Sequence, residues 1–523
     1  MGSPEQLQLI LEPQSKVYFD PVIVLDFQSL YPSMVIAYNY CYSTILGKIS
    51  NLIQMNNESR NREEIVLGAI KYYPSKDDFV KMVAYKEVCA SPLASMFVKK
   101  SKREGVVPLL LREILAARIM VKNAMKRVKS KKLKRILDAR QLALKLVANV
   151  TYGYTAANWS GRMPCAELAD AILGKGRETL ERAIEMVQKG DYCGAEVIYG
   201  DTDSLFVLVR GASVEKAFEI GRRIADDVTN SNPDPVVLKL EKVYKGCVLE
   251  TKKRYAGWMY ESENDEGSLD AKGIETVRRD TCPIVAEVLE KSLGLIFSQN
   301  WKTLITYLNR LVLNLPYENF SKFVFCKEYR GDYSPKAMVP QKKLAEARQK
   351  TCPSHITLRG ERVPYVIIDG VPGSTVYSCV RSIESFAKNP DYKINVYYYL
   401  NAHILAALRR VTDLIPMKID YVSLGADQCF VPDCSRIGKT PWCIGCQKNP
   451  EELSLALTQF AREKRARTEI RKTCSSCQSS TNPIGNVETL ECTNFSCLLR
   501  QTVAIMNRTR TREVIRAHKL YSL

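Results

Sequence analysis

The sequence predicts an α+β protein built from several folded units, followed by a small cysteine-rich domain. With 523 residues, the chain is too long to fold around one hydrophobic core. Short apolar, β-branched runs at 22–25 and 195–198 predict strands, whereas longer stretches near 108–129 and 132–156 have helical patterns. After residue 428, eight cysteines occur in four close pairs, which indicates a separate metal-binding module.

The chain is strongly basic. Lys and Arg number 76 and Asp and Glu 57, which gives a net charge of +19, and the 46% apolar content is that of a soluble globular protein. From Arg112 to Arg135 there are ten basic residues and one acidic residue. This clustering favours a polyanionic partner, nucleic acid above all, over a basic surface kept for solubility. No apolar run approaches the ~18 residues of a membrane helix, and with three histidines we expect no histidine-based catalysis.

Residues 199–207 read YGDTDSLFV and lie between two apolar runs. This pattern predicts a β-hairpin whose turn carries Asp201 and Asp203. Side chains two apart on an extended chain project to the same face, and two like charges held together favour a cation between them. Mg²⁺ suits such a site because it takes carboxylate and phosphate oxygens. The alternative is a polar turn that binds nothing.

A third carboxylate, Asp26, ends the predicted strand at 22–25. A short apolar helix follows, with Pro32 in its first turn and residues 34–38 in its body. A carboxylate at a strand end beside free helix amides can hold a metal and a phosphate side by side. The alternative is that Asp26 only caps the helix.

The two long helical patterns predict an antiparallel pair. Lys145, Asn149 and Tyr152 share one face of the second helix, and Arg118 on the first would lie opposite Lys145. Such a cationic hairpin could grip a triphosphate, although an ordinary solvated helix pair has the same pattern. The basic run 129–135 could also be mistaken for a nuclear localisation signal.

The rest of the chain is predicted more coarsely. Helices are expected near 165–189 and 213–229, a strand near 236–243, and a helical region from 272 to about 318. Residues 252–255 read KKRY, a mixture of cations and an aromatic ring that fits contact with a nucleic-acid backbone. Residues 51–100 look irregular, and 320–412 mix helix with loops.

The C-terminal cysteines form two sets of four. Each set suits tetrahedral zinc or an iron–sulfur cluster, and spacing alone does not separate the two. The sets are Cys429, Cys434, Cys443 and Cys446, and Cys474, Cys477, Cys492 and Cys497.

Four of these segments together resemble the motifs of B-family DNA polymerases, in the family's order. Residues 26–33 (DFQSLYPS) resemble its first palm motif, and 145–153 (KxxxNxxYG) its fingers motif. Residues 199–204 resemble its metal-binding motif, and 252–255 the primer–template contact that follows. The chain is most similar to the zeta subfamily of catalytic subunits, which act in translesion synthesis. That similarity is carried by residues 25–33, 35–41, 137–141, 160–165, 271–280 and 361–368 and by the cysteine sets.

The resemblance implies a right-hand polymerase core. Its parts would be a palm with an antiparallel sheet, fingers made of a helical hairpin, a mostly helical thumb and the cysteine-rich domain. We expect the palm at 1–100 and 159–275, the fingers at 101–158, the thumb at 276–425 and the C-terminal domain at 426–523.

The resemblance also implies a role for each motif residue. The catalytic, Mg²⁺-binding carboxylates would be Asp26, Asp201 and Asp203. The nucleotide would be bound by Phe27, Ser29, Leu30, Tyr31, Arg118, Lys145, Asn149, Tyr152 and Gly153, with Tyr31 excluding a 2′-hydroxyl. Primer–template DNA would be contacted by Lys252, Lys253, Arg254, Tyr255, Lys272, Arg278 and Arg279. The first cysteine set would hold zinc and the second a [4Fe-4S] cluster, although Cys429 departs from the family's usual spacing.

These roles describe a nuclear DNA-directed DNA polymerase that takes dNTPs and acts in DNA replication, lesion bypass and repair. Its partners would be accessory subunits shared with polymerase delta, a HORMA-type small subunit and the sliding clamp. Because the first palm motif starts at Asp26, we expect no exonuclease-like domain and no segment for the HORMA-type partner. The rival hypothesis is an inactive polymerase-fold scaffold whose metal modules assemble other subunits. A zinc-dependent DNA-binding regulator would leave the palm motifs unexplained.

Overall fold

The computed structural model describes residues 8–50, 65–67, 70–72, 76–157, 163–370, 374–415 and 419. The chain divides into two compact units. The first comprises Met1–Lys253 with Gly257–Ser268, and the second comprises Arg254–Ala256 with Leu269–Leu523. Both cysteine sets lie outside the described residues. None of the described helices combines the length and the apolarity needed to cross a bilayer.

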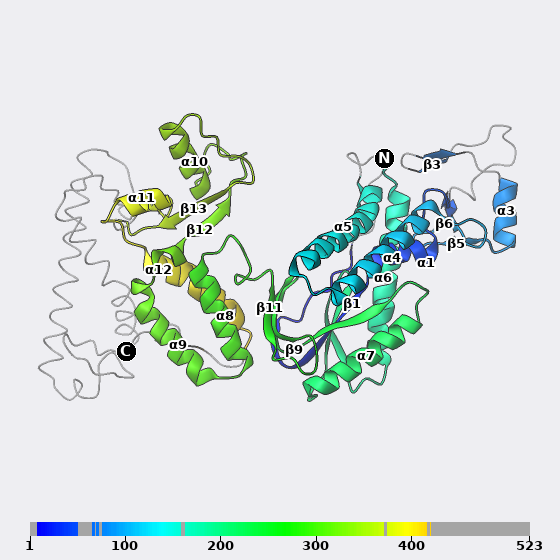
Figure 1. Ribbon diagram of the computed structural model, residues 1–523, viewed down its shortest axis with the longest axis horizontal. Coiled ribbons are helices and arrows are strands. Elements are labelled where there is room, and N and C mark those ends of the chain that lie inside the picture. The colour runs from blue at the N-terminus through cyan, green and yellow to red at the C-terminus, as the bar shows by residue number, and fades with distance from the viewer. Residues whose placement is uncertain are drawn as a thin grey trace, which may run out of the picture. The chain divides into compact units, whose positions relative to one another are not determined.

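An antiparallel sheet forms the centre of the first unit (Figure 1). Its core strands run in the order β9-β1-β8-β7, so the first strand along the chain is flanked by later ones. The sheet continues through β10 and β11, in which the chain passes to the second unit. The strands are β1 (Lys16–Phe27), β7 (Glu196–Asp201), β8 (Ser204–Leu208), β9 (Leu238–Thr251), β10 (Arg254–Tyr260) and β11 (Ser268–Lys272).

The predicted strand at 22–25 is confirmed as the buried middle of β1, where Val22 and Ile23 have no exposed surface. A strand covered on both faces is apolar throughout rather than alternating. β9 begins two residues after its predicted start but runs on to Thr251. Lys245 and Gly246 interrupt the apolar pattern within that extension and hide the strand in the sequence.

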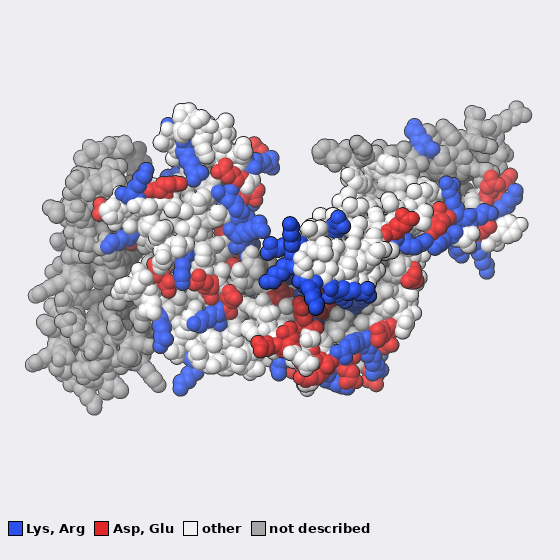
Figure 2. All heavy atoms as spheres, viewed as in Figure 1, with Lys and Arg blue, Asp and Glu red and all other residues white. Residues whose placement is uncertain are grey.

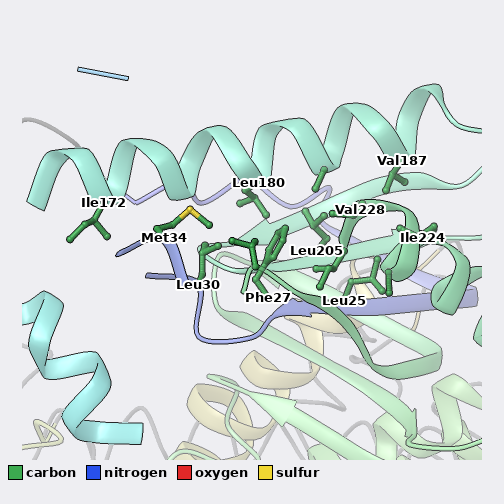
Figure 3. Close-up of a cluster of buried hydrophobic side chains, with 14 of the residues drawn as sticks. Leu25, Phe27, Leu30, Met34, Ile172, Leu180, Val187, Leu205, Ile224 and Val228 are labelled. Carbon is green, nitrogen blue, oxygen red and sulfur yellow. The ribbon is translucent and has the colours of Figure 1, made fainter. Parts of the chain in front are cut away.

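Helices α6 (Ala166–Lys189) and α7 (Val214–Asn230) pack with this sheet, and both confirm predicted helices. Their apolar side chains meet those of β1 and β8 in one cluster, where Leu180 of α6 and Ile224 of α7 are fully buried (Figure 3). Burying such a side chain contributes ~1.5–3 kcal/mol. The short helix α1 (Leu30–Tyr38) lies against α6 and brings Met34 into the same cluster.

The predicted helical hairpin is confirmed as α4 (Val106–Arg127) and α5 (Lys131–Ala156), which contact each other. Ser130 caps α5, because its side chain accepts a hydrogen bond from the Leu133 amide. Lysine and arginine side chains gather over this hairpin, whereas acidic and basic side chains are mixed over α7 (Figure 2). The basic cluster seen in the sequence is therefore a surface of the folded chain.

Residues before the hairpin contain more structure than the sequence suggested. One small sheet has the order β2-β6-β5, from β2 (Ile45–Lys48), β5 (Val88–Ala90) and β6 (Ser95–Val98). A ribbon of β3 (Ile65–Leu67) and β4 (Ile70–Tyr72) and the helix α3 (Lys76–Ala84) lie between β2 and β5 in the sequence. Strands of three or four residues are too short to show an alternating pattern.

The second unit is mostly helical but also contains a sheet of order β12-β13-β14. The sequence pattern predicts only helix and loops between 320 and 412, and this prediction is wrong for the sheet. Its strands are β12 (Phe325–Glu328), β13 (Arg362–Ile367) and β14 (Val380–Arg381). Its helices are α8 (Pro283–Phe297), α9 (Trp301–Asn314), η1 (Leu315–Tyr317), η2 (Phe320–Phe323), α10 (Pro340–Thr351), α11 (Ile383–Lys388), α12 (Val396–Tyr398), the π-helix η3 (Tyr399–Ile404) and α13 (Leu405–Thr412).

Candidate active site

The three predicted carboxylates come from two strand ends and the turn between β7 and β8. Ser204 pairs with Asp26 across β1 and with Asp201 across β7, so these two aspartates flank it at one edge of the sheet. Asp203 occupies the turn, and its carbonyl oxygen accepts a hydrogen bond of 2.8 Å from the Phe27 amide. The sheet register therefore brings the distant segments 26–27 and 201–203 together.

The turn is held in an unusual backbone conformation. Thr202 has a φ of 61°, which non-glycine residues rarely adopt. Its amide donates to the Leu9 carbonyl at 3.0 Å, and the Asp203 amide donates to the Asp201 carbonyl at 2.6 Å. Residues 8–14 run along β7 and hold the turn from outside, with a further bond of 2.9 Å from the Leu11 amide to the carbonyl of residue 200. Backbone hydrogen bonds from residues 8–14 therefore hold the end of β7 and the turn that carry Asp201 and Asp203.

Burial and mutual repulsion make this a costly place for negative charge. The pKa of Asp26 is raised to about 7, first by burial and then by the charges of Asp203 and Glu241. The pKa of Asp203 is raised too, first by burial and then by Asp201. Lys145 opposes both shifts. Lys145 is an exposed residue of α5. Because its charge acts on both aspartates, a cation of the helical hairpin lies within electrostatic range of the carboxylate pair.

The structure does not bear out the alternative that Asp26 caps α1. Ser29, not Asp26, occupies the N-cap position of α1, and its side chain makes no cap hydrogen bond. Ser29 has a left-handed backbone with φ of 50° and accepts a bond of 3.4 Å from the Arg118 guanidinium. Leu30 and Tyr31 form the first turn of α1, where backbone amides have no partner within the helix. Asp26 is therefore free of the capping role.

Two tyrosines meet at the same place. The Tyr31 and Tyr152 rings stack with their centroids 4.8 Å apart. Burial raises the pKa of Tyr31, and the charges of Asp203 and Asp201 add to this, which places the ring near the carboxylates. Next to Tyr152, a Cβ added at Gly153 would meet no atom within 4 Å. The α5 surface beside the tyrosine pair is thus open.

Helices α4 and α5 bring several cations together. Arg118 and Lys145, predicted to lie opposite each other, both act on Lys122, whose pKa is lowered first by burial and then by these neighbours. Lys239 of β9 contributes to the same effect. The sequence analysis missed Lys122, although it lies at i+4 from Arg118 and hence on the same helix face. Asn149 is exposed, one turn after Lys145 on α5.

The KKRY segment begins in the turn between β9 and β10. Lys253 has a φ of 63°, its amide donates to the buried Tyr199 hydroxyl at 2.9 Å, and its ammonium lies 3.7 Å from the Asp201 carboxylate. Lys252 pairs with Glu12 at 2.6 Å. The KKRY segment is thus attached through Tyr199 to β7, the strand that ends at Asp201.

The remaining predicted DNA contacts belong to the second unit. The Arg254 guanidinium pairs with the largely buried Glu275 at 3.0 Å, and Arg410 of α13 pairs with the same carboxylate at 2.7 Å. Tyr255 is half-buried beside Arg254, at the start of β10. Three further side chains are exposed around the 272–280 loop: Lys272, Arg278 and Arg279.

The aspartates are suitable ligands for a divalent cation, although they do not form a complete coordination shell among the described residues. Among the described residues, no group of three or more His, Cys, Asp or Glu is arranged to hold a metal. Asp26 and Asp203 are nevertheless half-buried oxygen donors with raised pKa values. Mg²⁺ characteristically takes one or two protein carboxylates and completes its shell with water and phosphates. Glu241, which acts on both aspartates, is a further carboxylate that the sequence analysis did not single out.

Comparison with known proteins agrees with this geometry. The family model for DNA polymerase family B matches residues 5–415. The chain, with its antiparallel sheet, helical hairpin and carboxylate pair, belongs to this family of polymerases.

Among individual proteins, the DNA polymerase zeta catalytic subunit of Drosophila melanogaster is 42% identical over 95% of this chain and 25% of its own length. That of Arabidopsis thaliana is 48% identical over 79% of this chain and 22% of its own length. The DNA polymerase delta catalytic subunit of Bos taurus is 32% identical over 84% of this chain and 39% of its own length. The chain spans between 16% and 31% of the length of the zeta relatives it matches.

Proposed function

We propose that this chain is the polymerase core of a zeta-type enzyme, which adds deoxynucleotides to a primer 3′-end on a DNA template during translesion synthesis. The observation that carries the proposal is the position of Asp26 beside Asp203 at one sheet edge, facing Lys145 of the helical hairpin. Carboxylates and cations so opposed match the needs of phosphoryl transfer, in which positioning and charge stabilisation do most of the work.

The metal would be held by Asp26 and Asp203, with Asp201 and the Phe27 carbonyl assisting. When bound, Mg²⁺ activates the primer hydroxyl and neutralises the leaving pyrophosphate. The chain itself keeps the carboxylates together, because the hydrogen bond from the Phe27 amide to the Asp203 carbonyl ties the two segments. Lys253 lies beside Asp201 and offsets part of its charge.

The incoming nucleotide would be held from two sides. Arg118, Lys122 and Lys145 of the hairpin supply positive charge for the triphosphate, and Asn149 extends the same face of α5. The first-turn amides of α1, at Leu30 and Tyr31, face phosphate oxygens from the sheet side. Ser29 positions Arg118 through its hydroxyl.

The sugar and base would meet the tyrosine pair. Tyr31 would lie under the sugar and exclude a 2′-hydroxyl, while Tyr152 and Gly153 line the nascent base pair. The stacking of Tyr31 on Tyr152 supports these roles, since it links the two surfaces. The open space beside Gly153 leaves room for a base pair.

Primer–template DNA would run along the KKRY segment and the 272–280 loop. Lys252, Lys253 and the exposed loop cations would contact its phosphates, which fix position and carry no sequence information. Arg254 would also reach the duplex, held in place by Glu275.

The cysteine-rich segment would hold zinc in its first set and a [4Fe-4S] cluster in its second. Four thiolates at such spacings suit either metal site. We propose that these modules dock accessory subunits shared with polymerase delta, and that the assembly acts in the nucleus with a sliding clamp. Iron and zinc analysis of anaerobically purified protein, with Cys474→Ser and Cys429→Ser compared, tests the assignment of each set.

Primer extension with Mg²⁺ and the four dNTPs tests the activity. We expect extension by the unmutated chain and a loss of ~10³ or more in Asp203→Ala, equivalent to ~4 kcal/mol of transition-state stabilisation. Glu185→Ala, which removes an exposed carboxylate of α6, is the matched control and should extend normally. A folded, unmutated chain that fails to extend even with added partners would support the inactive scaffold instead.

A further inference from the structure

Helix α6 carries two glycines in its interior, Gly174 and Gly176, and both are at least partly covered by other residues. Glycine is among the least favourable residues inside a helix, so an interior glycine usually has a packing or functional reason. The two positions have the same backbone setting and lie within one turn of each other. Their surroundings differ, and the difference concerns the proposed nucleotide site.

Gly176 lies directly against Tyr31. A Cβ built on Gly176 would be 3.2 Å from Tyr31 Cε1, 3.5 Å from Tyr31 Cδ1 and 3.6 Å from Leu30 Cδ2. The first distance is tighter than most real contacts of a Cβ, so the ring would have to move by a few tenths of an ångström. A Cβ on Gly174 would instead meet only Pro92, at an ordinary 3.5 Å.

The Tyr31 ring cannot easily move toward Tyr152 to make room for the added Cβ. One face stacks on Tyr152, with an angle of 29° between the ring planes. Tyr31 belongs to α1, which packs against α6, and the adjacent Leu30 is buried in the central cluster. The Tyr31 side chain is only partly covered, and the charges of Asp201 and Asp203 act on it, so its ring borders the proposed site. A ring pushed away from α6 therefore moves toward the open site.

We propose that Gly176 sets sugar selectivity: the absence of a side chain there lets the Tyr31 ring lie deep enough to accept a deoxyribose and still exclude a 2′-hydroxyl. This inference rests on the proposed function, in which Tyr31 lies under the sugar. Gly176 touches no substrate. It is a positioning residue that acts through Tyr31. Helix α6 thereby contributes to the selection of deoxyribonucleotides over ribonucleotides.

The test compares Gly176→Ala with Gly174→Ala in the full 523-residue chain. Both variants add one methyl group to the same helix, but only the first crowds Tyr31. We expect Gly176→Ala to raise KM for dNTP about 3- to 10-fold with a smaller change in kcat, and to lower kcat/KM for rNTP further, so that discrimination against ribonucleotides increases. Gly174→Ala should leave discrimination unchanged. Equal discrimination in the two variants, or a decrease in Gly176→Ala, would overturn the inference.

A double-mutant cycle separates this role from a general effect on packing. With Tyr31→Ala in the background, Gly176→Ala should no longer alter discrimination, because the ring it displaces is gone. The double variant also relieves the crowding if Gly176→Ala alone folds poorly. A persistent effect of Gly176→Ala without the ring would contradict the proposed route through Tyr31.

Nucleotide-binding measurements distinguish failure of the inference on Gly176 from failure of the proposed polymerase function. Affinities for dATP and ATP are measured on a complex with dideoxy-terminated primer and template, so that no turnover is needed. If the unmutated chain discriminates and Tyr31→Ala relaxes this, but the glycine variants behave alike, only the inference on Gly176 fails. If the unmutated chain neither extends a primer nor binds either nucleotide, the proposed function fails, and the inference fails with it.

Discussion

The Phe27 amide donates a 2.8 Å hydrogen bond to the Asp203 carbonyl oxygen, which joins the end of β1 to the turn between β7 and β8. This bond and the pairing of Asp26 with Ser204 hold two carboxylates together at one sheet edge. Repulsion and burial oppose their ionisation, so the surrounding fold must supply the energy that keeps them in place. Ionised carboxylates at this position therefore lower the stability of the chain, and a cation bound between them would offset this loss.

Asp26→Asn should stabilise the chain in the absence of divalent metal while abolishing primer extension. The pKa of Asp26 is about 7 in the fold and 3.8 in the unfolded reference. The folded state therefore binds more protons between pH 4 and 7, and stability falls as pH rises through this window. Asparagine cannot ionise, so at pH 8 we expect a gain on the order of 2 to 4 kcal/mol.

Urea unfolding in EDTA at pH 4.5 and pH 8 measures this effect. The two proteins should differ little at pH 4.5, where Asp26 is protonated in the fold, and clearly at pH 8. Addition of Mg²⁺ should then stabilise the unmutated chain more than Asp26→Asn. An asparagine variant that is less stable at pH 8 would show that Asp26 is satisfied by the protein alone.

Lys122→Ala should weaken nucleotide binding. Lys122 lies within the electrostatic range of Arg118, Lys145 and Lys239, and this crowding of positive charge is relieved when a triphosphate is bound. We expect KM for dNTP to rise about 10-fold or more, equivalent to at least ~1.4 kcal/mol, without a change in affinity for primer–template. Arg127→Ala removes an exposed cation of α4 that is not among the charges acting on Lys122, and it is the matched control. Equal KM values in both variants would remove Lys122 from the nucleotide site.

Glu275→Ala should destabilise the second unit by about 2 kcal/mol. Glu275 is 13% exposed and pairs with both the partly buried Arg254 and the exposed Arg410, so its loss leaves the Arg254 guanidinium without this partner in a partly buried place. Asp280→Ala breaks the exposed pair with Arg278 and should cost less than ~1 kcal/mol. Thermal unfolding of both variants gives the comparison, and similar losses would mean that burial of the Glu275 pair contributes little.

Acid should weaken the second unit through His403. Aromatic rings of Phe325 and Tyr398 surround its imidazole, and burial lowers its pKa to about 4 from the ordinary 6.5. The unfolded state then binds the additional proton, so the stability due to neutral His403 is complete above pH 6.5 and is lost as pH falls toward 4. We expect a loss of about 2 kcal/mol, after a discount for partial exposure.

Unfolding curves between pH 4 and 7 for His403→Phe test this expectation, since phenylalanine has a similar ring and does not titrate. The variant should have a flatter dependence of stability on pH. His355→Phe removes an exposed histidine from the same unit and should retain the slope of the unmutated chain. A slope unaffected by His403→Phe would assign the acid sensitivity to other groups.

The long, regular elements could be predicted because their patterns are local. The hairpin of α4 and α5 and the helices α6 and α7 begin and end within about two residues of their predicted bounds. The three-stranded sheet at 325–381 was missed, since β12 and β14 are four and two residues long. Such strands are defined by their partners rather than by a pattern of their own.

The motif residues and the family of the chain could be predicted from the sequence alone. Asp26, Asp201 and Asp203 stand in short motifs whose residue types and spacing are readable without a structure. Tertiary structure decided what these motifs touch. Only the sheet register places Asp26 beside Asp203, and only the packing of α6 on α1 brings Gly176 against Tyr31. The physical reason is that secondary structure depends on periodicities over a few residues, whereas pKa shifts and contacts of 3 to 4 Å depend on which distant segments meet.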